Sequence, residues 1–270
     1  MRYDRGRHTP TAAVGCNMQN KTFDSYADHY EKVLNRHLPP GMEHADFLTQ
    51  KREWMHLLIK RFFPLRSNLK YLDFGCGIGS LCEAMIENPH VSEIVGVDES
   101  SESRRMACER ISQLNQRPGS SQKVGFQVYE KISDLPAGAQ FDLITAFNVF
   151  HHITPKKRAD CAQELTKYLS DGGILAVWEH NPWNPFTRFL VRICPFDRDA
   201  SLMPRSQAIE LWRVDDLELQ INEYINITPP SFQRFKPVLA IEESLGGLPL
   251  GAQYRLAFIK TNKRVLDERP

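Results

Sequence analysis

The chain has 270 residues, a formal net charge of +1, and 41% hydrophobic and 10% aromatic residues. This length and composition predict one enlarged globular domain, or one domain with a small cap. The near-neutral charge provides no global field to attract nucleic acid or an anionic membrane. The apolar runs are too short and too interrupted to span a bilayer, and the start lacks a secretory apolar region. We therefore predict a cytoplasmic protein whose six scattered cysteines are reduced.

The first quarter of the chain is predicted to be helical. Residues 1–20 are polar and irregular, and we expect them to form a flexible tail. Apolar side chains then recur at helical spacing from Phe23 to Leu38, and a second such stripe runs from Phe47 to Phe62. Because two helices precede the first strand, we predict that residues 21–66 form a helical cap over the active site.

From residue 67 onward, strand and helix patterns alternate, which is typical of a parallel sheet with helices on both faces. Strands are predicted near 70–74, 93–97, 124–128, 141–147, 173–179, 219–227 and 253–260. Helices are predicted near 80–87, 100–115, 156–169, 204–213 and 238–245. The predicted fold is α/β, with a seven-stranded, mostly parallel sheet whose last pair is antiparallel. The main domain is expected over 67–262, followed by a tail at 263–270.

Two short segments in this domain have the pattern of a nucleoside-binding site. Tyr71-Leu-Asp-Phe-Gly-Cys-Gly-Ile-Gly-Ser80 reads as a buried strand that enters a glycine-rich turn and then a helix. Glycines let the backbone approach a ligand closely, and the helix that follows presents free N–H groups. The next predicted strand ends at Asp98, whose carboxylate can accept hydrogen bonds from both hydroxyls of a ribose.

The spacing of these residues distinguishes between cofactors. A dinucleotide fingerprint requires a glycine at position 80, which is Ser80 here, and no Lys-Ser/Thr pair of a phosphate-binding loop follows the glycines. Asp73 stands two residues before the first glycine. An acid there would repel a pyrophosphate but suits the ammonium of a methionine moiety. The pattern resembles motif I of class I S-adenosylmethionine-dependent methyltransferases. The resemblance of the chain to this family extends from about Phe23 to Thr261 and is strongest from 70 to 180.

This resemblance implies S-adenosylmethionine as cofactor, S-adenosylhomocysteine as its product, and a set of cofactor contacts. Those contacts are expected from Asp73, Gly75, Cys76, Gly77, Gly79, Asp98, Glu99, Phe147 and Asn148. After the third strand, the family often has an acid that binds the adenine amino group. Glu130 is the nearest acid in this chain, although Tyr129 could stack on the base instead and Glu130 could be a solvated loop residue.

Histidines follow the fourth and fifth predicted strands. His151 and His152 could serve as a general base, since an unperturbed imidazole titrates near neutral pH, or could be purely structural. A metal site at His151 and His152 would need a third ligand, which only Glu179 or His180 would supply, so we predict no metal. Our candidates for the base are His180 and then His152, with Glu179 orienting or tuning one of them.

The segment after the fifth strand is predicted to line the substrate pocket. Glu179-His-Asn-Pro-Trp-Asn-Pro185 places titratable groups where a core strand would be apolar, and its Asn-Pro pairs favour extended turns. We expect a lid or substrate insertion over 181–213, with a short amphipathic helix from Phe186 to Ile193 that either faces the core or forms an apolar lid. Substrate contacts are assigned to His151, Asn181, Trp183, Arg198 and Arg205. Lys51 is a further candidate, for the carboxylate of the cofactor.

These motifs resemble a subgroup of the family with a Glu-His-Asn-Pro-x-Asn-Pro signature, a Cys-Pro-Phe-Asp element and a Leu-Pro-Leu-Gly-Ala-Gln-Tyr motif, the last at 248–254. We predict a biosynthetic small-molecule methyltransferase that favours oxygen over carbon or nitrogen, with an aromatic or lipid-like substrate. The alternatives are a non-methylating reaction such as cyclisation or decarboxylation, and a non-catalytic partner protein. A nucleic-acid substrate is disfavoured, because no basic tract or RNA-binding module is present.

Overall fold

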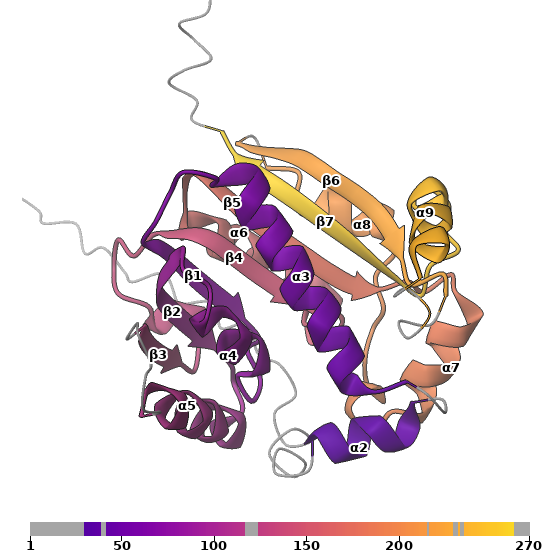
Figure 1. Cartoon of the computed structure of the whole chain (residues 1–270), viewed down its shortest axis with the longest axis horizontal. Helices are drawn as coiled ribbons and strands as arrows, with labels where there is room; N and C mark the ends of the chain where they lie inside the picture. The colour runs from indigo at the N-terminus through magenta and orange to yellow at the C-terminus, as the bar shows by residue number, and fades with distance from the viewer. Residues whose placement is uncertain are drawn as a thin grey trace, which may run out of the picture.

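The computed structural model describes residues 30–38, 42–116, 124–214, 216–228, 232 and 235–261, and its strands and helices alternate along the chain (Figure 1). The strands are β1 (Leu69–Phe74), β2 (Val91–Val97), β3 (Gly125–Tyr129), β4 (Phe141–Phe147), β5 (Leu169–His180), β6 (Leu217–Ile225) and β7 (Gln253–Lys260). The α-helices are α2 (Tyr30–His37), α3 (His44–Phe62), α4 (Ser80–Ile86), α5 (Ser101–Asn115), α6 (Arg158–Lys167), α7 (Pro185–Ile193), α8 (Arg205–Leu211) and α9 (Lys236–Leu245). The 3-10 helices are η2 (Ile132–Asp134), η3 (Phe150–His152), η4 (Pro155–Lys157) and η5 (Pro195–Asp197). The expected tails and the start of the helix expected from Phe23 lie outside the described residues.

The seven strands form one sheet in the order β3-β2-β1-β4-β5-β7-β6. Strands β1 to β5 pair in parallel, whereas β7 runs antiparallel to both β5 and β6. The predicted seven-stranded, mostly parallel α/β fold is therefore confirmed. The strand order reverses between β1 and β4, and ligands of such sheets bind outside the carboxyl ends of the strands at that point.

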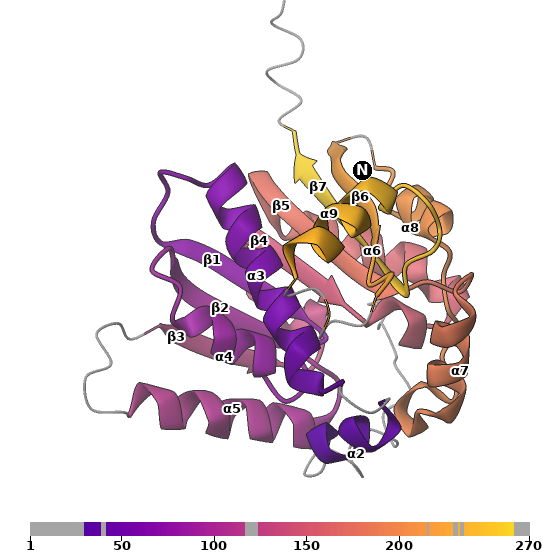
Figure 2. The same ribbon diagram turned by 45° about the vertical axis from the view of Figure 1, so that its right-hand side comes forward.

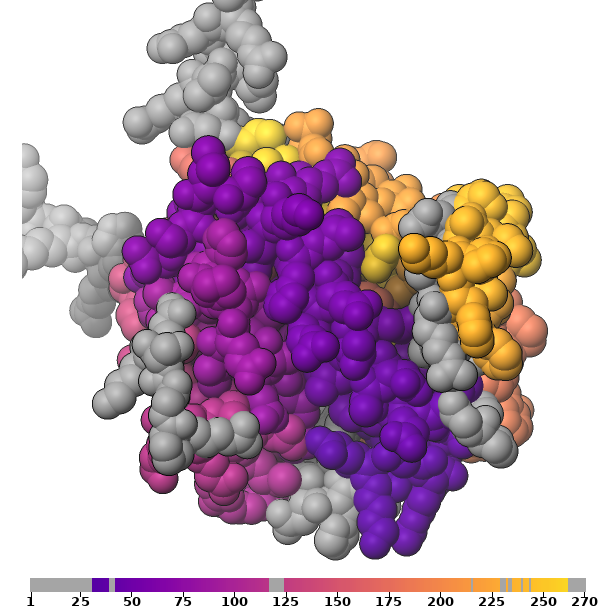
Figure 3. Space-filling view, in the orientation of Figure 1, coloured from indigo at the N-terminus to yellow at the C-terminus, as the bar shows by residue number. Residues whose placement is uncertain are grey.

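Helices cover both faces of the sheet, and each face has its own apolar core (Figures 1 and 2). On one face, Trp54 of α3 stacks on Phe147 and meets Trp178 edge-on, with ring centroids 5.4 and 5.5 Å apart. Figure 3 shows side chains of α3 over the middle of this face. On the other face, Trp212 packs edge-on against Phe150. Helix α3 thus belongs to the core of the sheet, and the division into a cap and a main domain stays a prediction.

The cysteines differ from one another in chemical state. Cys76, Cys82, Cys108 and Cys194 carry free thiols, whereas Cys161 is disulfide-bonded. The expectation of reduced cysteines is therefore wrong at Cys161, because the scattered spacing along the chain carries no signal of pairing between distant segments. No helix in the described part of the chain is long and apolar enough to cross a bilayer.

Candidate active site

The glycine-rich turn after β1 is shaped by two close approaches of the backbone. Gly75 has φ +77°, and a Cβ there would lie 2.2 Å from the Val149 side chain. Gly79 caps α4 with φ +77°, and a Cβ would lie 2.9 Å from Ala107 of α5. Gly77, with φ +51°, has nothing within 4 Å of the position that a Cβ would take. Gly77 therefore leaves open space at the turn, and Gly79 serves the packing of α4 on α5.

Asp98, just after β2, is fixed by backbone donors. The Gly77 amide donates to Oδ2 at 2.8 Å, and the Ser100 amide donates to Oδ1 at 3.0 Å. Burial raises the pKa of Asp98 to about 6, against the opposing effect of these two amides. Each carboxylate oxygen can accept a further bond, so two adjacent hydroxyls of a ribose would find acceptors here.

Asp73, near the end of β1, lies in a buried network between β1 and β4. The Thr145 hydroxyl donates to its Oδ1 at 2.7 Å and also lies 2.8 Å from the Tyr71 hydroxyl, while the Cys82 thiol lies 3.5 Å from Oδ2. Burial raises the pKa of Asp73, although Thr145, Cys82 and the Lys51 ammonium oppose the shift. The network holds the carboxylate at the wall of the cavity, as an ammonium-binding group requires.

Helix α3 supplies a cation to the same cavity. The Lys51 ammonium lies 5.9 Å from the centroid of the Phe147 ring. Burial lowers the pKa of Lys51 to about 8, while the carboxylates of Asp73 and Glu179 oppose the shift. Lys51 is thus a half-buried cation near the buried acid Asp73, an arrangement that suits both ends of an amino-acid moiety. Lys51 lines the cavity, and its assignment to the cofactor's carboxylate stays a prediction.

Two side-chain amides fix the ring of His180, the last residue of β5. Asn148, which follows β4 with φ +59°, places its Nδ2 2.9 Å from His180 Nε2. Gln253, at the start of β7, places its Nε2 3.5 Å from His180 Nδ1. Gln253 itself is held because its Oε1 accepts from the Trp178 indole at 3.0 Å. The ring of His180 is therefore held in one orientation at the cavity wall.

Glu179 ties β5 to the loop after β4. One of its oxygens accepts from the Val149 and Phe150 amides at 2.9 and 2.7 Å, and the other lies 2.5 Å from His151 Nδ1. His151 Nε2 then lies 3.4 Å from Asp197 Oδ1, which is also 3.4 Å from His152 Nε2. Glu179 therefore orients His151, the histidine predicted to contact the substrate. None of these hydrogen bonds of Glu179 goes to His180 or His152, the two predicted bases.

The three histidines have different pKa values. Burial opposes a charge on His151, but the Glu179 and Asp197 carboxylates outweigh it and raise its pKa to about 10. Burial, together with the charge on His151, lowers the pKa of His180 to about 4 and that of His152 to about 3. The site therefore holds one charged imidazole and two neutral ones near pH 7.

The same group contains potential metal ligands. One ligand atom each of His151, His152 and Asp197 lies within 4.8 Å of the others. Two imidazoles and a carboxylate form a donor set for a divalent transition metal. His151 would have to lose its proton first, so a proton and a metal ion are alternative partners of this group. The prediction that the site uses no metal stays untested.

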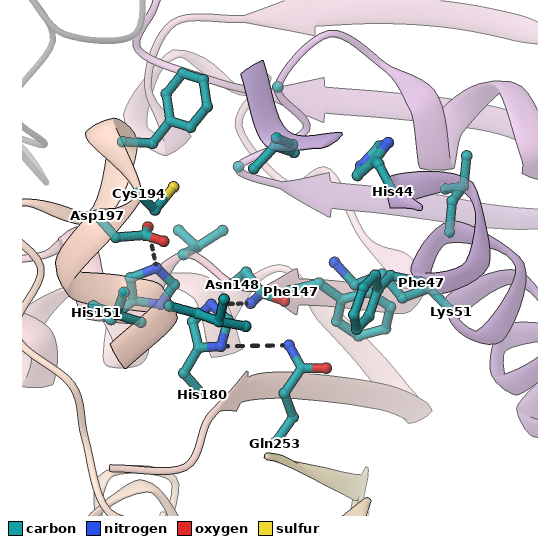
Figure 4. Close-up of a pocket in the computed structure, with 18 of the residues that line it drawn as sticks. His44, Phe47, Lys51, Phe147, Asn148, His151, His180, Cys194, Asp197 and Gln253 are labelled. Atoms are coloured by element: carbon teal, nitrogen blue, oxygen red, sulfur yellow. Dashed lines mark hydrogen bonds and ion pairs between the residues drawn. The ribbon is translucent and has the colours of Figure 1, made fainter. Parts of the chain in front are cut away.

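One continuous cavity of about 520 Å³ is lined by Asp73, Asp98, Lys51, Asp197 and the three histidines, whereas Glu179 is not part of its lining. Figure 4 shows Lys51, Phe47 and His44 on one side of it and Asp197, Cys194 and His151 on the other. Two buried atoms in its wall, Ser80 Oγ and Asn148 Oδ1, have no hydrogen-bond partner among the described residues. Unpartnered buried polar atoms are costly, and a polar ligand would satisfy them. The open space at Gly77, the Asp98 oxygens and these two atoms fit an adenosyl amino acid.

Most of the predicted cofactor residues line this cavity. They are Asp73, Gly75, Cys76, Gly77, Asp98, Glu99, Phe147 and Asn148. Gly79 and Glu130 are not part of the lining. Glu130 instead pairs with Arg104 and Lys131, at 3.4 and 3.1 Å. Its assignment to adenine has no geometric support in the structure.

The predicted substrate residues divide in the same way. His151 lines the cavity, but Trp183, Arg198 and Arg205 do not. The Arg205 guanidinium lies 3.9 Å from the centroid of the Tyr224 ring. Asn181 is buried, and its amide donates to the carbonyls of Pro249 and Gly251 at 3.1 and 2.8 Å. Asn181 therefore holds a loop in place.

Sequence reasoning missed Gln253, Ser80 and Thr145 as parts of the site. The signal for Gln253 was available in principle, because it is a polar residue at the start of a mainly apolar strand. It pairs in register with His180 across β5 and β7. Ser80 and Thr145 gave no signal, since single hydroxyls are common at helix starts and in strands.

Comparisons with known proteins agree with this geometry. Residues 44–227 match the model of a family described as a methyltransferase domain. A cyclopropane-fatty-acyl-phospholipid synthase of Escherichia coli strain K12 is 31% identical over 139 residues, 48% of this chain and 33% of that protein. A mitochondrial ubiquinone biosynthesis O-methyltransferase of Candida albicans is 33% identical over 110 residues, 40% of this chain and 32% of that protein. The chain spans about a third of the length of these two relatives.

A solved structure shows the same fold. The magnesium protoporphyrin IX methyltransferase (ChlM) of Synechocystis PCC 6803, crystallised with bound SAH, is similar with a TM-score of 0.59 and 12% identity. The match covers 88% of this chain and 97% of that chain.

The chain has the fold of class I, S-adenosylmethionine-dependent methyltransferases, as predicted. Because the family model matches more than half of its residues, the chain belongs to the methyltransferase domain family. Membership of the subgroup with the Glu-His-Asn-Pro-x-Asn-Pro signature stays a prediction.

Proposed function

We propose that this chain transfers a methyl group from S-adenosylmethionine to a small molecule, with an oxygen atom as the favoured acceptor. The observation that carries the proposal is the single cavity. The glycine-rich turn and Asp98 line one part of it, and the histidine cluster lines another. Donor and acceptor sites in one enclosed space are what an in-line transfer requires.

The cofactor supplies a methyl group activated on a sulfonium, and the residues of the chain align it and exclude water. Asp98 would bind the ribose, Asp73 the ammonium and Lys51 the carboxylate. Phe147 and Asn148, at the end of β4, line the cavity between Lys51 and His180. The acceptor would therefore meet the methyl group near the end of β4.

His180 is the favoured general base, with His152 as second candidate. Both line the cavity, and His180 is held by its two amide partners. A hydroxyl acceptor needs to lose its proton during transfer, and a positioned base contributes typically about 10²–10⁴-fold to such a step. Replacing His180 by alanine should lower kcat by about this factor if it is the base. His152→Ala is the matched comparison.

The cavity wall favours an acceptor with an apolar part. The segment from α7 to η5 contributes Phe186, Leu190, Val191 and Phe196 to it, and the segment from α2 to α3 contributes Leu34, Leu38, Met42 and Phe47. Apolar lining with few polar groups is typical of sites for drug-sized organic molecules. The names of the two relatives, a phospholipid synthase and a ubiquinone O-methyltransferase, are in keeping with such an acceptor.

A non-methylating reaction is the second candidate, because one relative is named as a synthase that forms a cyclopropane ring. Incubation of the protein with methyl-labelled S-adenosylmethionine and an extract of small molecules separates the two. Methyl transfer predicts S-adenosylhomocysteine together with a product that retains all three methyl hydrogens. A product that forms while the cofactor stays intact would contradict it, as would a labelled product that has lost methyl hydrogens.

A further inference from the structure

Helix α7 lies at one edge of the molecule (Figures 1 and 2). Several large apolar side chains of this helix and its neighbours are exposed. Trp183 is 67% exposed, Phe189 is 58% exposed, and Phe186 and Ile193 are also exposed. Leu248 and Leu250 are each half exposed in the turn before β7. Asn184 donates to the Leu250 carbonyl at 2.7 Å, so this turn lies against the start of α7. We call these six apolar residues the apolar edge.

Helix α7 has one buried side and one exposed side that carries both apolar and basic residues. Thr187 and Val191 are buried beneath the helix, while Phe189 and Ile193, four residues apart, point outward from one side. Arg188 and Arg192 are exposed on the same helix. A short helix with aromatic and aliphatic side chains flanked by arginines is typical of segments that lie in the headgroup region of a bilayer.

The charges around the apolar edge are mainly positive, although the net charge of the whole chain is only +1. Among the described residues of the segment 183–199, Arg188, Arg192 and Arg198 are exposed, against the single exposed acid Asp199. Each basic side chain near an anionic leaflet adds to the attraction between the protein and that leaflet. A symmetric contact with a second copy would bring these arginines toward one another, because both copies would use the same patch. The charge pattern therefore favours an anionic lipid surface over a second copy.

The apolar edge also reaches the cavity. Phe186 is 41% exposed and at the same time lines the cavity, as does its neighbour Leu190. A chain of apolar groups from outside could thus pass along α7 toward the histidine cluster without leaving apolar contact. No helix in the described residues could cross the bilayer, so any membrane contact in this part would be peripheral.

We propose that the apolar edge docks on the surface of an anionic phospholipid membrane and receives an acceptor with an apolar chain from it. This inference deepens the proposed function, on which the identity of the acceptor rests. The docking itself is independent of methyl transfer and is measured without it.

Trp183 provides a direct reporter. All four tryptophans are described, and Trp54, Trp178 and Trp212 are at most 2% exposed, so Trp183 is the one that a membrane would reach. Vesicles of phosphatidylcholine and phosphatidylglycerol should shift the emission of the full chain to shorter wavelength, and brominated lipid should quench it. Vesicles of phosphatidylcholine alone should have a much smaller effect. Absence of a shift, together with absence of co-sedimentation with anionic vesicles, would overturn the proposal.

Variants locate the contact. Phe189→Glu should weaken partitioning to anionic vesicles about tenfold or more, and Arg192→Gln about fivefold. Leu65→Glu is the matched control, because Leu65 is 97% exposed but lies before β1, at the opposite end of the sheet. Equal losses in the control would overturn the assignment, as would a dimer in solution that Phe189→Glu dissociates. Binding of S-adenosylhomocysteine should be unchanged in all three variants, which separates a failure of docking from a failure of the cofactor site.

Discussion

At the scale of single residues, Asp98 makes cofactor binding dependent on pH. Burial raises its pKa to about 6, so the carboxylate that would accept the ribose hydroxyls is lost as the pH falls through this value. The association constant for S-adenosylmethionine should therefore fall about tenfold for each pH unit below 6. Titration calorimetry between pH 4.5 and 7.5 measures this.

The raised pKa of Asp98 also makes the stability of the ligand-free protein depend on pH, but in the opposite direction to cofactor affinity. A carboxyl group whose pKa is raised on folding stabilises the folded state less as the pH rises from the unfolded value toward about 6.

The control for the pH dependence of cofactor binding is an Asp98→Asn variant, whose binding should be weak and should no longer vary with pH between 4.5 and 7.5. Full pH dependence in that variant would assign the effect to another group.

The lowered pKa of Lys51 predicts that cofactor affinity also falls at higher pH. Burial lowers its pKa to about 8, so its charge is lost as the pH rises through this value. If the ammonium pairs with the cofactor's carboxylate, affinity for S-adenosylhomocysteine should decline above pH 8, and Lys51→Met should weaken binding about tenfold. Binding of 5′-methylthioadenosine, which lacks the amino-acid end, should not change in this variant. An equal loss for both ligands would contradict the pairing.

At the scale of elements, Glu179 joins β5 to η3 by accepting two backbone amides and contacting His151. Glu179→Ala would leave the Val149 and Phe150 amides buried without these partners. Each unsatisfied buried group costs about 1–3 kcal/mol, so the loss of both partners should lower the free energy of unfolding by about 2–6 kcal/mol. Urea denaturation measures the change.

Glu93→Ala is the control for this substitution. Glu93 lies on β2 and forms an exposed ion pair with Lys70 at 3.1 Å, an interaction worth at most about 1 kcal/mol. A loss of stability in Glu179→Ala no larger than in Glu93→Ala would show that the buried bonds contribute little.

The elements themselves were largely predictable. The segments 70–74 and 141–147 are rich in apolar residues and bounded by turn residues, and the structure has strands at Leu69–Phe74 and Phe141–Phe147. The direction in which the apolar side chains of α7 point was harder to predict from the sequence. Its periodicity fits a core-facing stripe and a lid equally, and only the neighbouring structure shows that Phe189 faces outward while Val191 is buried.

At the scale of the whole molecule, the site was predictable where it is local in the chain. The glycine-rich turn and Asp98 follow directly from two buried strands, and most of their neighbours line the cavity. The contacts of Glu179 with His151 and of His151 with Asp197 join segments that only the tertiary fold brings together. Spacing along the chain cannot show such pairings, and for the same reason the ion pairs of Glu130 were missed.

The central claim is that this cavity binds S-adenosylmethionine through Asp98. Its most direct test is calorimetric titration of S-adenosylhomocysteine into the protein, Asp98→Ala and the control Glu130→Ala. We expect a dissociation constant on the order of micromolar for the unmodified protein, no measurable binding in Asp98→Ala, and a constant unchanged within about twofold in Glu130→Ala. Absence of binding in the unmodified protein would contradict it, and so would binding that survives in Asp98→Ala or disappears in Glu130→Ala.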